Sequence, residues 1–175
     1  MEKYKVKIKG TASLLQNKKV EMDTGVSKVA ENRDSPDKCK GKLYIYSKKI
    51  CQPAIMIEQA LIKAATGIKM KGAGKKSFKE LFKGNVFIKP ENIPHKSQKW
   101  EVHQTTVVIP ATKGRINRYR PMLKNWELNF TIEVLDDRIE KGVLKLALDE
   151  AGRTIGIGDW RPRFGRFIVT EFKEV

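Results

Sequence analysis

Twelve residues near the C-terminus combine the side chains that phosphates and bases favour. The stretch GIGDWRPRFGRF, residues 156–167, contains three glycines, three arginines and one tryptophan. Arginine neutralises phosphates, an indole stacks on an unpaired base, and glycine lets a phosphate chain approach main-chain N–H groups. The predicted nucleic-acid contacts in this region are Arg153, Gly156, Gly158, Trp160, Arg161, Arg163 and Arg166. The alternative is a packed turn, in which Trp160 or Phe164 joins the core and the arginines pair with carboxylates such as Asp159.

Two other segments are rich in basic residues. Residues 69–84, KMKGAGKKSFKELFKG, hold six lysines and one glutamate, and residues 111–121, ATKGRINRYRP, hold four basic residues and no acid. Clusters of this kind favour contact with a polyanion, so we expect two cationic loops that follow one nucleic-acid strand. The residues expected to make these contacts are Lys69, Lys71, Lys75, Lys76, Lys113, Arg115, Arg118 and Arg120. Ordinary solvated charge is the alternative interpretation.

The familiar nucleotide-binding and catalytic patterns do not occur in the sequence. The glycines of residues 156–167 precede an expected strand, whereas a dinucleotide-binding loop precedes a helix, and no Gly-Lys is followed by Ser or Thr. We find no metal-ligand spacing and no serine or cysteine nucleophile motif, so we assign no catalytic residue, metal or cofactor. His103 is the one candidate for general acid–base chemistry, as in a metal-independent endoribonuclease. A structural histidine is the alternative.

The overall charge points to the same kind of partner. The 175 residues include 36 Lys and Arg and 20 Asp and Glu, which gives a formal net charge of +16. Such an excess favours nucleic acid first and an acidic membrane surface second. Cys39 and Cys51 form neither a metal pattern nor a disulfide framework, and no signal-peptide core or membrane-length apolar run occurs. We therefore expect a cytoplasmic protein without membrane contact, built as one domain.

The hydrophobic pattern predicts the elements that position these residues. Strands are expected at 3–9, 42–47, 85–90, 100–110, 125–134 and 166–172, and helices at 53–66 and 136–151. This order predicts an α+β fold that is ferredoxin-like (RRM-like): an antiparallel sheet with helices on one face and a glycine-rich loop before the last strand. Basic insertions at about 16–41 and 68–120 extend this single domain of residues 1–175, and 111–121 is expected to be a loop.

Two apolar faces are expected to contribute to the core. In the strand at 125–134 the core face is Trp126, Leu128, Phe130, Ile132 and Val134. The second helix is expected to start at Asp136 and Asp137 and to stop at Gly152. Its inward stripe is expected to be Ile139, Val143, Leu146, Ala147 and Glu150. Seven carboxylates lie between residues 127 and 150, which suggests that acidic and basic side chains occupy separate surfaces.

Three segments together resemble the RAMP superfamily, which comprises RNA-binding subunits of CRISPR effector complexes and their processing endoribonucleases. The segments are KVKIKGTASLL at 5–15, QPAIMIEQALIKAA at 52–65 and GIGDWRPRFGRF at 156–167. They are similar to the family's first strand with its small-residue loop, to its helix entry and to its glycine-rich loop. The chain is also similar to stand-alone proteins of this type that phages and prophages carry.

The resemblance implies RNA binding along the helix at 54–66, the glycine-rich loop and a protruding thumb at 16–41 or 100–120. It also implies head-to-tail homo-oligomers on RNA, or assembly with other effector-complex subunits. The family's endoribonucleases carry a histidine early in this helix, whereas here both histidines lie downstream, and Glu58 and Gln59 stand where the family often has a glycine and a base. We therefore expect non-catalytic binding of RNA or single-stranded nucleic acid. The alternatives are a metal-independent endoribonuclease and a phage protein that binds or mimics a CRISPR complex subunit.

Overall fold

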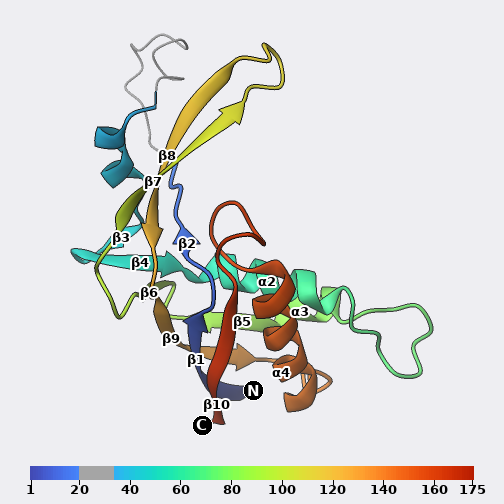
Figure 1. The fold of residues 1–175 in the computed structure, drawn as a ribbon. Coiled ribbons are helices and arrows are strands. Elements are labelled where there is room, and N and C mark those ends of the chain that lie inside the picture. Colours follow the sequence, from blue (N-terminus) through green and yellow to red (C-terminus); the bar gives the residue numbers. More distant parts are fainter. Residues whose placement is uncertain (20–33) are drawn as a thin grey trace.

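A four-stranded antiparallel sheet organises the lower half of the molecule in the view of Figure 1. The structure, a computed structural model, describes residues 1–19 and 34–175. The strand order across the sheet is β10-β1-β9-β5. Its strands are β1 (Glu2–Gly10), β5 (Val86–Lys89), β9 (Glu127–Val134) and β10 (Phe167–Glu174). The predicted combination of an antiparallel sheet with helices is therefore confirmed.

Alternating side chains give this sheet one apolar and one polar face. In β1, Tyr4, Val6 and Ile8 are buried, while the intervening lysines point to the opposite face. Two of those lysines pair with carboxylates on the neighbouring strands, since the Lys3 Nζ lies 2.7 Å from Glu133 and another lysine pairs with β10. The predicted core face of the strand at 125–134 is confirmed: Trp126, directly before β9, and four residues of β9 are buried, namely Leu128, Phe130, Ile132 and Val134.

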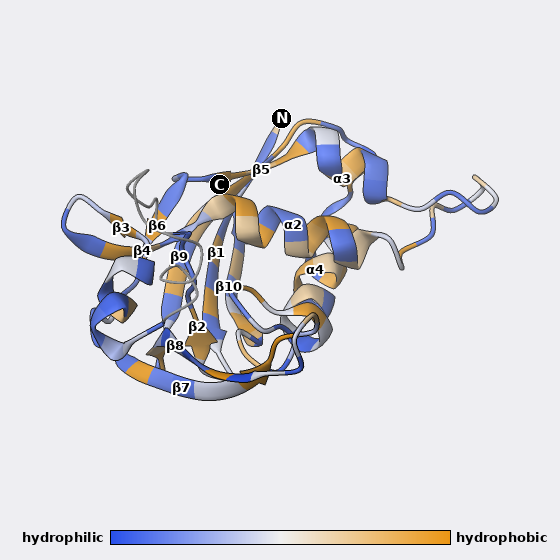
Figure 2. Cartoon of the chain, turned by 90° about the horizontal axis from the view of Figure 1, so that it is seen from above, coloured by the Kyte–Doolittle hydropathy of each residue, from blue (hydrophilic) through white to orange (hydrophobic). Residues whose placement is uncertain are grey.

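Helices pack on the apolar side of the sheet (Figure 2). They are α2 (Ala54–Ala65), α3 (Lys79–Asn85) and α4 (Lys141–Glu150). Helix α2 begins directly after Pro53, in agreement with the expected helix at 53–66, and buries Ile57 and Leu61 completely. In the part of the chain that the structure describes, no helix is long and apolar enough to cross a membrane.

Helix α4 begins later than the sequence pattern predicts. Asp136 does not start the helix: its carboxylate accepts hydrogen bonds from the backbone and guanidinium N–H groups of Arg138, which forms a turn. The helix starts only at Lys141. The inward stripe is consequently shifted to Leu144, Ala147 and Leu148, and Leu146, expected in the core, is 54% exposed.

Gly152 does not end this helix, contrary to the prediction. The helix continues into a π-helical turn, η2 (Ala151–Ile155), and the chain turns only at Gly156, where φ is 72°. Gly152 is instead required by close packing, because a Cβ there would lie 2.3 Å from the carbonyl oxygen of Phe167. The helix end is thus pressed against the start of β10.

A long hairpin protrudes from the sheet at the top of Figure 1. Its strands are β7 (Glu101–Val108) and β8 (Arg115–Leu123), and the short strand β2 (Leu14–Leu15) pairs with the base of β8. The prediction of a loop at 111–121 is therefore wrong, because most of this segment belongs to β8. Both faces of the outer hairpin are at least partly exposed, so its sequence lacks the apolar alternation that identifies a half-buried strand.

A third small sheet lies beside the hairpin base. Its strands are β3 (Ile45–Tyr46), β4 (Lys49–Pro53) and β6 (Asn92–Pro94), so only part of the strand expected at 42–47 forms. Of the predicted basic insertion at 16–41, residues 20–33 lie outside the described residues. The remainder includes a short 3₁₀ helix, η1 (Pro36–Lys42), which packs on β8.

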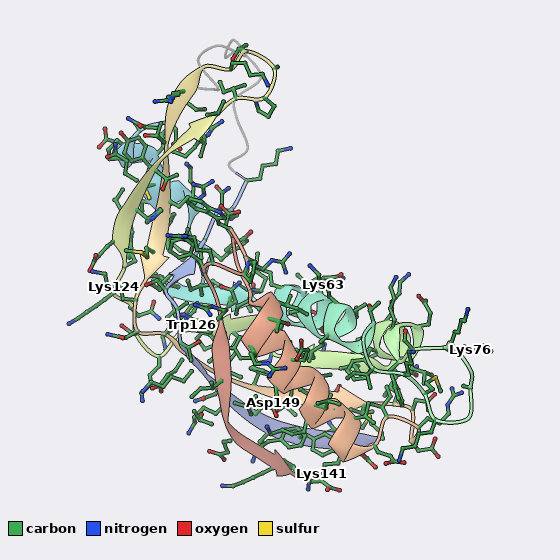
Figure 3. The ribbon with its side chains drawn as sticks, turned by 45° about the vertical axis from the view of Figure 1, so that its right-hand side comes forward. Lys63, Lys76, Lys124, Trp126, Lys141 and Asp149 are labelled. Carbon is green, nitrogen blue, oxygen red and sulfur yellow. The ribbon has the colours of Figure 1, made fainter. Side chains whose placement is uncertain are left out.

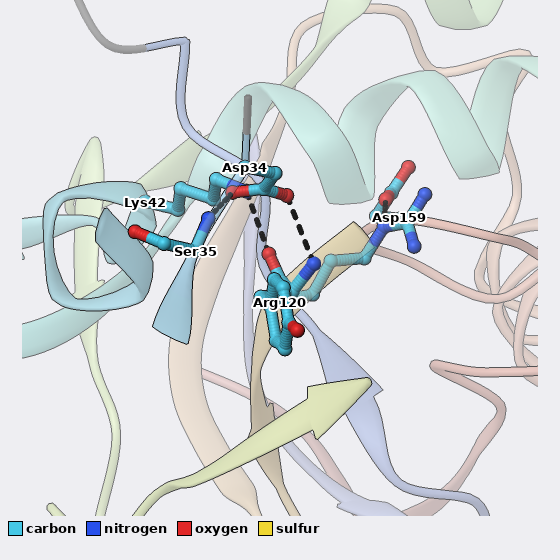
Figure 4. Close-up of polar contacts among 6 residues, drawn as sticks. Asp34, Ser35, Lys42, Arg120 and Asp159 are labelled. Atoms are coloured by element: carbon cyan, nitrogen blue, oxygen red, sulfur yellow. Dashed lines mark hydrogen bonds and ion pairs between the residues drawn. The ribbon is translucent and has the colours of Figure 1, made fainter. Parts of the chain in front are cut away.

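Side chains hydrogen-bond the backbone N–H and carbonyl groups at several strand edges. In Figure 4, the side chains of Asp34 and Lys42 hydrogen-bond the backbone of β8 at Tyr119, where an adjacent strand would otherwise bond. The Tyr119 N–H donates to Asp34 Oδ2 at 2.9 Å, and the Lys42 ammonium donates to the Tyr119 carbonyl at 2.6 Å. Similarly, Glu58 of α2 accepts the N–H of Ile88 at the edge of β5. These contacts satisfy polar groups that a missing strand would leave unpaired.

The pair formed by Asp34 and Lys42 should make stability depend on pH. Burial raises the pKa of Asp34, but hydrogen bonds from Lys42, Tyr119 and Ser35 outweigh this, so its net pKa lies below the ordinary value. A depressed pKa in the folded state contributes stability above the unfolded pKa of about 4 and loses it as the pH falls. Asp34→Asn should reduce the free energy of unfolding by about 3 kcal/mol at neutral pH, because it leaves Lys42 buried without its charge partner.

Urea denaturation followed by tryptophan fluorescence at several pH values measures this effect. The difference between wild type and Asp34→Asn should be complete above about pH 5 and shrink towards pH 2. Asp37→Asn is the matched control, because Asp37 lies in the same segment but is exposed. A difference that does not change with pH would contradict the assignment of the stabilisation to the Asp34 charge.

Candidate nucleic-acid interface

The glycine-rich loop, residues 156–166, folds tightly against the chain that follows β1. The N–H of Gly165 donates to the Ser13 carbonyl and the N–H of Asp159 donates to the Leu15 carbonyl, both at 2.8 Å. Within the loop, the N–H of Ile157 donates to the carbonyl of Gly165. The loop is therefore held by main-chain hydrogen bonds, and its outer turn carries residues 160–164 into solvent.

The loop glycines serve close packing in this structure. Gly156, Gly158 and Gly165 all have positive φ, at 72°, 81° and 76°. A Cβ at Gly158 would lie 2.5 Å from Leu14 Cδ1 and from the Leu15 carbonyl, and a Cβ at Gly165 would lie 1.7 Å from the carbonyl oxygen of Ile157. Their close approach is thus to other parts of the same chain, and contact of Gly156 or Gly158 with phosphate stays a prediction.

A cluster of side chains joins this loop to the hairpin. Arg120 of β8 and His103 of β7 face each other across the strands. The Arg120 guanidinium donates from Nε to Asp159 Oδ2 and lies over the Trp160 ring, 5.7 Å from its centroid. The rings of His103 and Phe164 lie 5.1 Å apart in an edge-to-face arrangement. Figure 4 shows the arm of Arg120 extending towards Asp159.

Arg120 is therefore an internal residue rather than an exposed contact. Its side chain is 15% exposed, and its Nη1 is buried with no hydrogen-bond partner among the described residues. The guanidinium charge is balanced by Asp159, and its central carbon lies over the Trp160 ring at a cation–π distance. The prediction had grouped Arg120 with the phosphate contacts, whereas the structure places it between β8 and the glycine-rich loop.

Burial lowers the pKa of both histidines. Burial lowers the pKa of His95 to about 4, and His95 packs edge-on against Trp126. Burial, and then the nearby charge of Arg120, lowers the pKa of His103. The Nδ1 of His103 has no hydrogen-bond partner in the described part of the chain, so no carboxylate or carbonyl there orients its ring. This environment resembles that of a packed histidine more than that of a general base.

Three arginines near this cluster have no carboxylate partner among the described residues. Arg118 lies on the same face of β8 as Arg120, one side-chain repeat further out. Arg161 and Arg163 are exposed on the glycine-rich loop. Within residues 1–19 and 34–175, no carboxylate lies within 4 Å of these three guanidinium groups. Arg115 points to the other face of the hairpin, and Lys113 lies at its tip.

The lysine-rich segment lies at a different place. Lys69, Lys71, Lys75 and Lys76 are exposed on the loop after α2, at the far right of Figure 3, where Lys76 is labelled. The glycine-rich loop bonds to Leu15, and the adjacent Gln16 bonds to Cys51 and Gln52 just before the start of α2, so the loop lies near the other end of this helix. A helix of 12 residues spans about 18 Å. The structure therefore separates these lysines from the arginines of the hairpin and loop.

The sequence predicts that the seven carboxylates at 127–150 form a separate acidic surface. This prediction is wrong. Most of these carboxylates pair with basic residues: Glu127 with Lys96, Glu133 with Lys3, Asp136 with Arg138, Asp149 with Lys145 and Glu150 with Arg153. The guanidinium of Arg153, a predicted nucleic-acid contact, is thus committed to Glu150 at 2.7 Å.

Comparison with known proteins gives a likeness in fold. No family model matches the sequence, and no curated protein matches it. Among solved structures, a chain in "Cryo-EM structure of the Type III-B Cmr-beta bound to cognate target RNA" matches with a TM-score of 0.57 and 14% sequence identity. The match covers 99% of the present chain but only 60% of the Cmr-beta chain. The present chain thus spans about 60% of the length of the matched chain. At this identity the likeness concerns the α+β fold.

Substitution of a loop glycine should test how tightly the loop is packed. Gly165→Ala should reduce the free energy of unfolding by at least about 1–3 kcal/mol, because alanine is strained at this φ and its Cβ would collide with Ile157. Gly142→Ala in α4 is the control, because nothing lies within 4 Å of a Cβ added at Gly142. This variant should have unchanged stability or be up to about 1 kcal/mol more stable. Chemical denaturation measures both. Equal stability of the two variants would show that the loop is not constrained as described.

Proposed function

We propose that this chain binds RNA, or another single-stranded nucleic acid, without cleaving it, through the surface formed by the glycine-rich loop and the β7–β8 hairpin. The observation that carries the proposal is a set of arginines with no carboxylate partner among residues 1–19 and 34–175: Arg161 and Arg163, which are exposed, and Arg118, which is partly exposed. The loop and the hairpin contain only two carboxylates, Asp159 and Glu101, and each already pairs with another basic residue, so the described part of this surface does not compensate these three arginines. Phosphates are the partner that such a surface attracts.

The fold supports a particular biological setting for this binding. The order β10-β1-β9-β5, with α2 after β1 and α4 before β10, is the order of a ferredoxin-like βαββαβ unit. The RAMP-like motifs lie in β1, at the start of α2 and in the loop before β10. The Cmr-beta chain with a similar fold belongs to a structure bound to its target RNA. We infer a single RAMP-like domain that acts in a CRISPR-type ribonucleoprotein, with further copies or other effector subunits as partners.

The lysine loop, residues 68–78, extends the proposed surface. It carries four of the lysines predicted to bind phosphates, and its exposed tip contains Gly72 and Gly74, both at positive φ. Because α2 separates it from the arginines, a strand that contacts both must be long enough to cross that helix. Lys113 and Arg115 extend the surface in the other direction, along the hairpin tip.

The dependence of RNA affinity on salt tests this function. Fluorescence anisotropy with a labelled single-stranded RNA of about 12 nucleotides should give a steep linear fall of log affinity with log salt. Arg118→Gln, Arg161→Gln and Arg163→Gln should each weaken binding and reduce the slope by about 0.7, the value for one lost phosphate contact on a single strand. Arg138→Gln is the control, because Arg138 is exposed but pairs with Asp136 away from this surface. Absence of binding at about 50 mM salt would refute the proposal.

The absence of cleavage is a separate expectation. Labelled hairpin RNA incubated with the protein in the presence of a metal chelator should stay intact, because nothing in the described residues orients His103 for proton transfer. Denaturing gel electrophoresis of reactions with wild type and His103→Ala makes the measurement. Cleavage by the wild type that His103→Ala abolishes would establish the endoribonuclease alternative.

A further inference from the structure

We infer that Arg120 and Asp159 are positioning residues that hold Trp160 as a stacking platform for one unpaired base; this inference rests on the proposed function. The ligand class is a single strand with an accessible base face, rather than a continuous duplex. Arg120 thereby acts through Trp160 and makes no phosphate contact of its own. The β7–β8 hairpin and the glycine-rich loop form one binding unit because this pair of residues joins them.

The backbone of Trp160 shows that its position is imposed by the surroundings. Its φ is 53°, in the left-handed region that a bulky side chain rarely adopts. The residue is nevertheless kept at the tip of the loop, and 43% of it is exposed. By contrast, Trp126 is 1% exposed and is part of the core. A large aromatic ring held in an unfavourable backbone conformation at the surface is a feature that packing alone does not require.

The neighbours of Trp160 fix the ring without enclosing it. The Arg120 guanidinium lies over the ring, and the rings of Phe164 and His103 approach at 5.6 and 6.2 Å between centroids. The His103 contact is edge-on, at an interplanar angle of 71°. These contacts restrict the indole, while its exposed part stays available to a base. A platform that is already ordered costs less conformational entropy when a base stacks on it.

The ion pair between Arg120 and Asp159 provides the restraint. Asp159 directly precedes Trp160, and its N–H is fixed on the Leu15 carbonyl, so its carboxylate has a defined position from which to hold Arg120. The two ionic partners come from β8 and from the loop, 39 residues apart in sequence. Arg118, one repeat further out on the same face of β8, has no ionic partner in the described ranges 1–19 and 34–175 and faces solvent in part.

Asp159→Asn separates positioning from simple charge attraction. The substitution removes a negative charge, so an electrostatic role alone predicts tighter RNA binding. Our inference predicts the reverse: affinity for oligouridylate of about 12 nucleotides should fall about tenfold, and the quenching of tryptophan fluorescence by RNA should be lost. The salt slope should stay that of the wild type. Arg118→Gln, the matched control on β8, should lower the slope and keep the quenching.

A double-mutant cycle shows whether Asp159 acts through Trp160. Trp160→Ala should lose about as much affinity as Asp159→Asn, and the variant with both changes should bind like Trp160→Ala alone. The charge swap Arg120→Asp with Asp159→Arg, which keeps the net charge, should recover part of the affinity and the quenching. Thermal melting of each variant identifies any loss of fold, and the charge swap keeps the test decisive if Asp159→Asn melts early.

The possible results distinguish failure of the positioning role of Asp159 from failure of RNA binding itself. Wild-type protein that binds RNA with quenching, together with Asp159→Asn that binds as tightly or more tightly with the same quenching, would overturn the positioning role and leave the proposed function intact. Additive losses in the cycle would overturn it as well. Failure of the wild type to bind any single strand would refute the proposed function itself.

Discussion

Main-chain hydrogen bonds to residues 13–16 determine where the glycine-rich loop lies. The carbonyls of this segment accept the N–H groups of Gly165 and Asp159. Its two leucines pair with the base of β8, and the buried amide of Gln16 donates to the carbonyl of Cys51 in β4. One short segment is thus bonded to the loop, the hairpin and the third sheet. The distance between hairpin and loop, and with it the cluster around Arg120, depends on these bonds being kept.

The distribution of charge partners is more informative here than the net charge. A value of +16 identifies a polyanion as the preferred class of ligand but does not locate it. The structure shows which basic residues are neutralised locally, because Lys3, Lys96 and Arg153 lie beside carboxylates, so the excess charge belongs to other residues. It also shows that Arg120 and Arg118, only two residues apart, have different surroundings. Proximity in sequence therefore did not mean a shared role.

Strands with one buried face could be predicted from sequence, whereas of the two exposed hairpin strands only β7 was predicted, as the strand at 100–110. The alternation in β1 and β9 follows from burial of one face, which is a local property of the sequence. Strand β8 has arginines on both faces of a protruding hairpin, so no such alternation exists to detect. The pairing of Arg120 with Asp159 depends on tertiary packing across 39 residues, which spacing alone cannot fix. The late start of α4 has a local cause: Arg138 donates to Asp136 two residues earlier, and this turn replaces the expected first turn of the helix.

The side chains that occupy strand edges also bear on how copies of this protein behave when crowded. An unpaired strand edge is a template on which another chain can add a strand and seed aggregation. Asp34 and Lys42 occupy that template on β8, Glu58 does so on β5, and the Gln98 amide bonds both the N–H and the carbonyl of Ile50 on β4. A long polyanion that gathers many copies raises their local concentration. At these positions the backbone groups already have partners, so they are not free to pair with a strand of a neighbouring molecule.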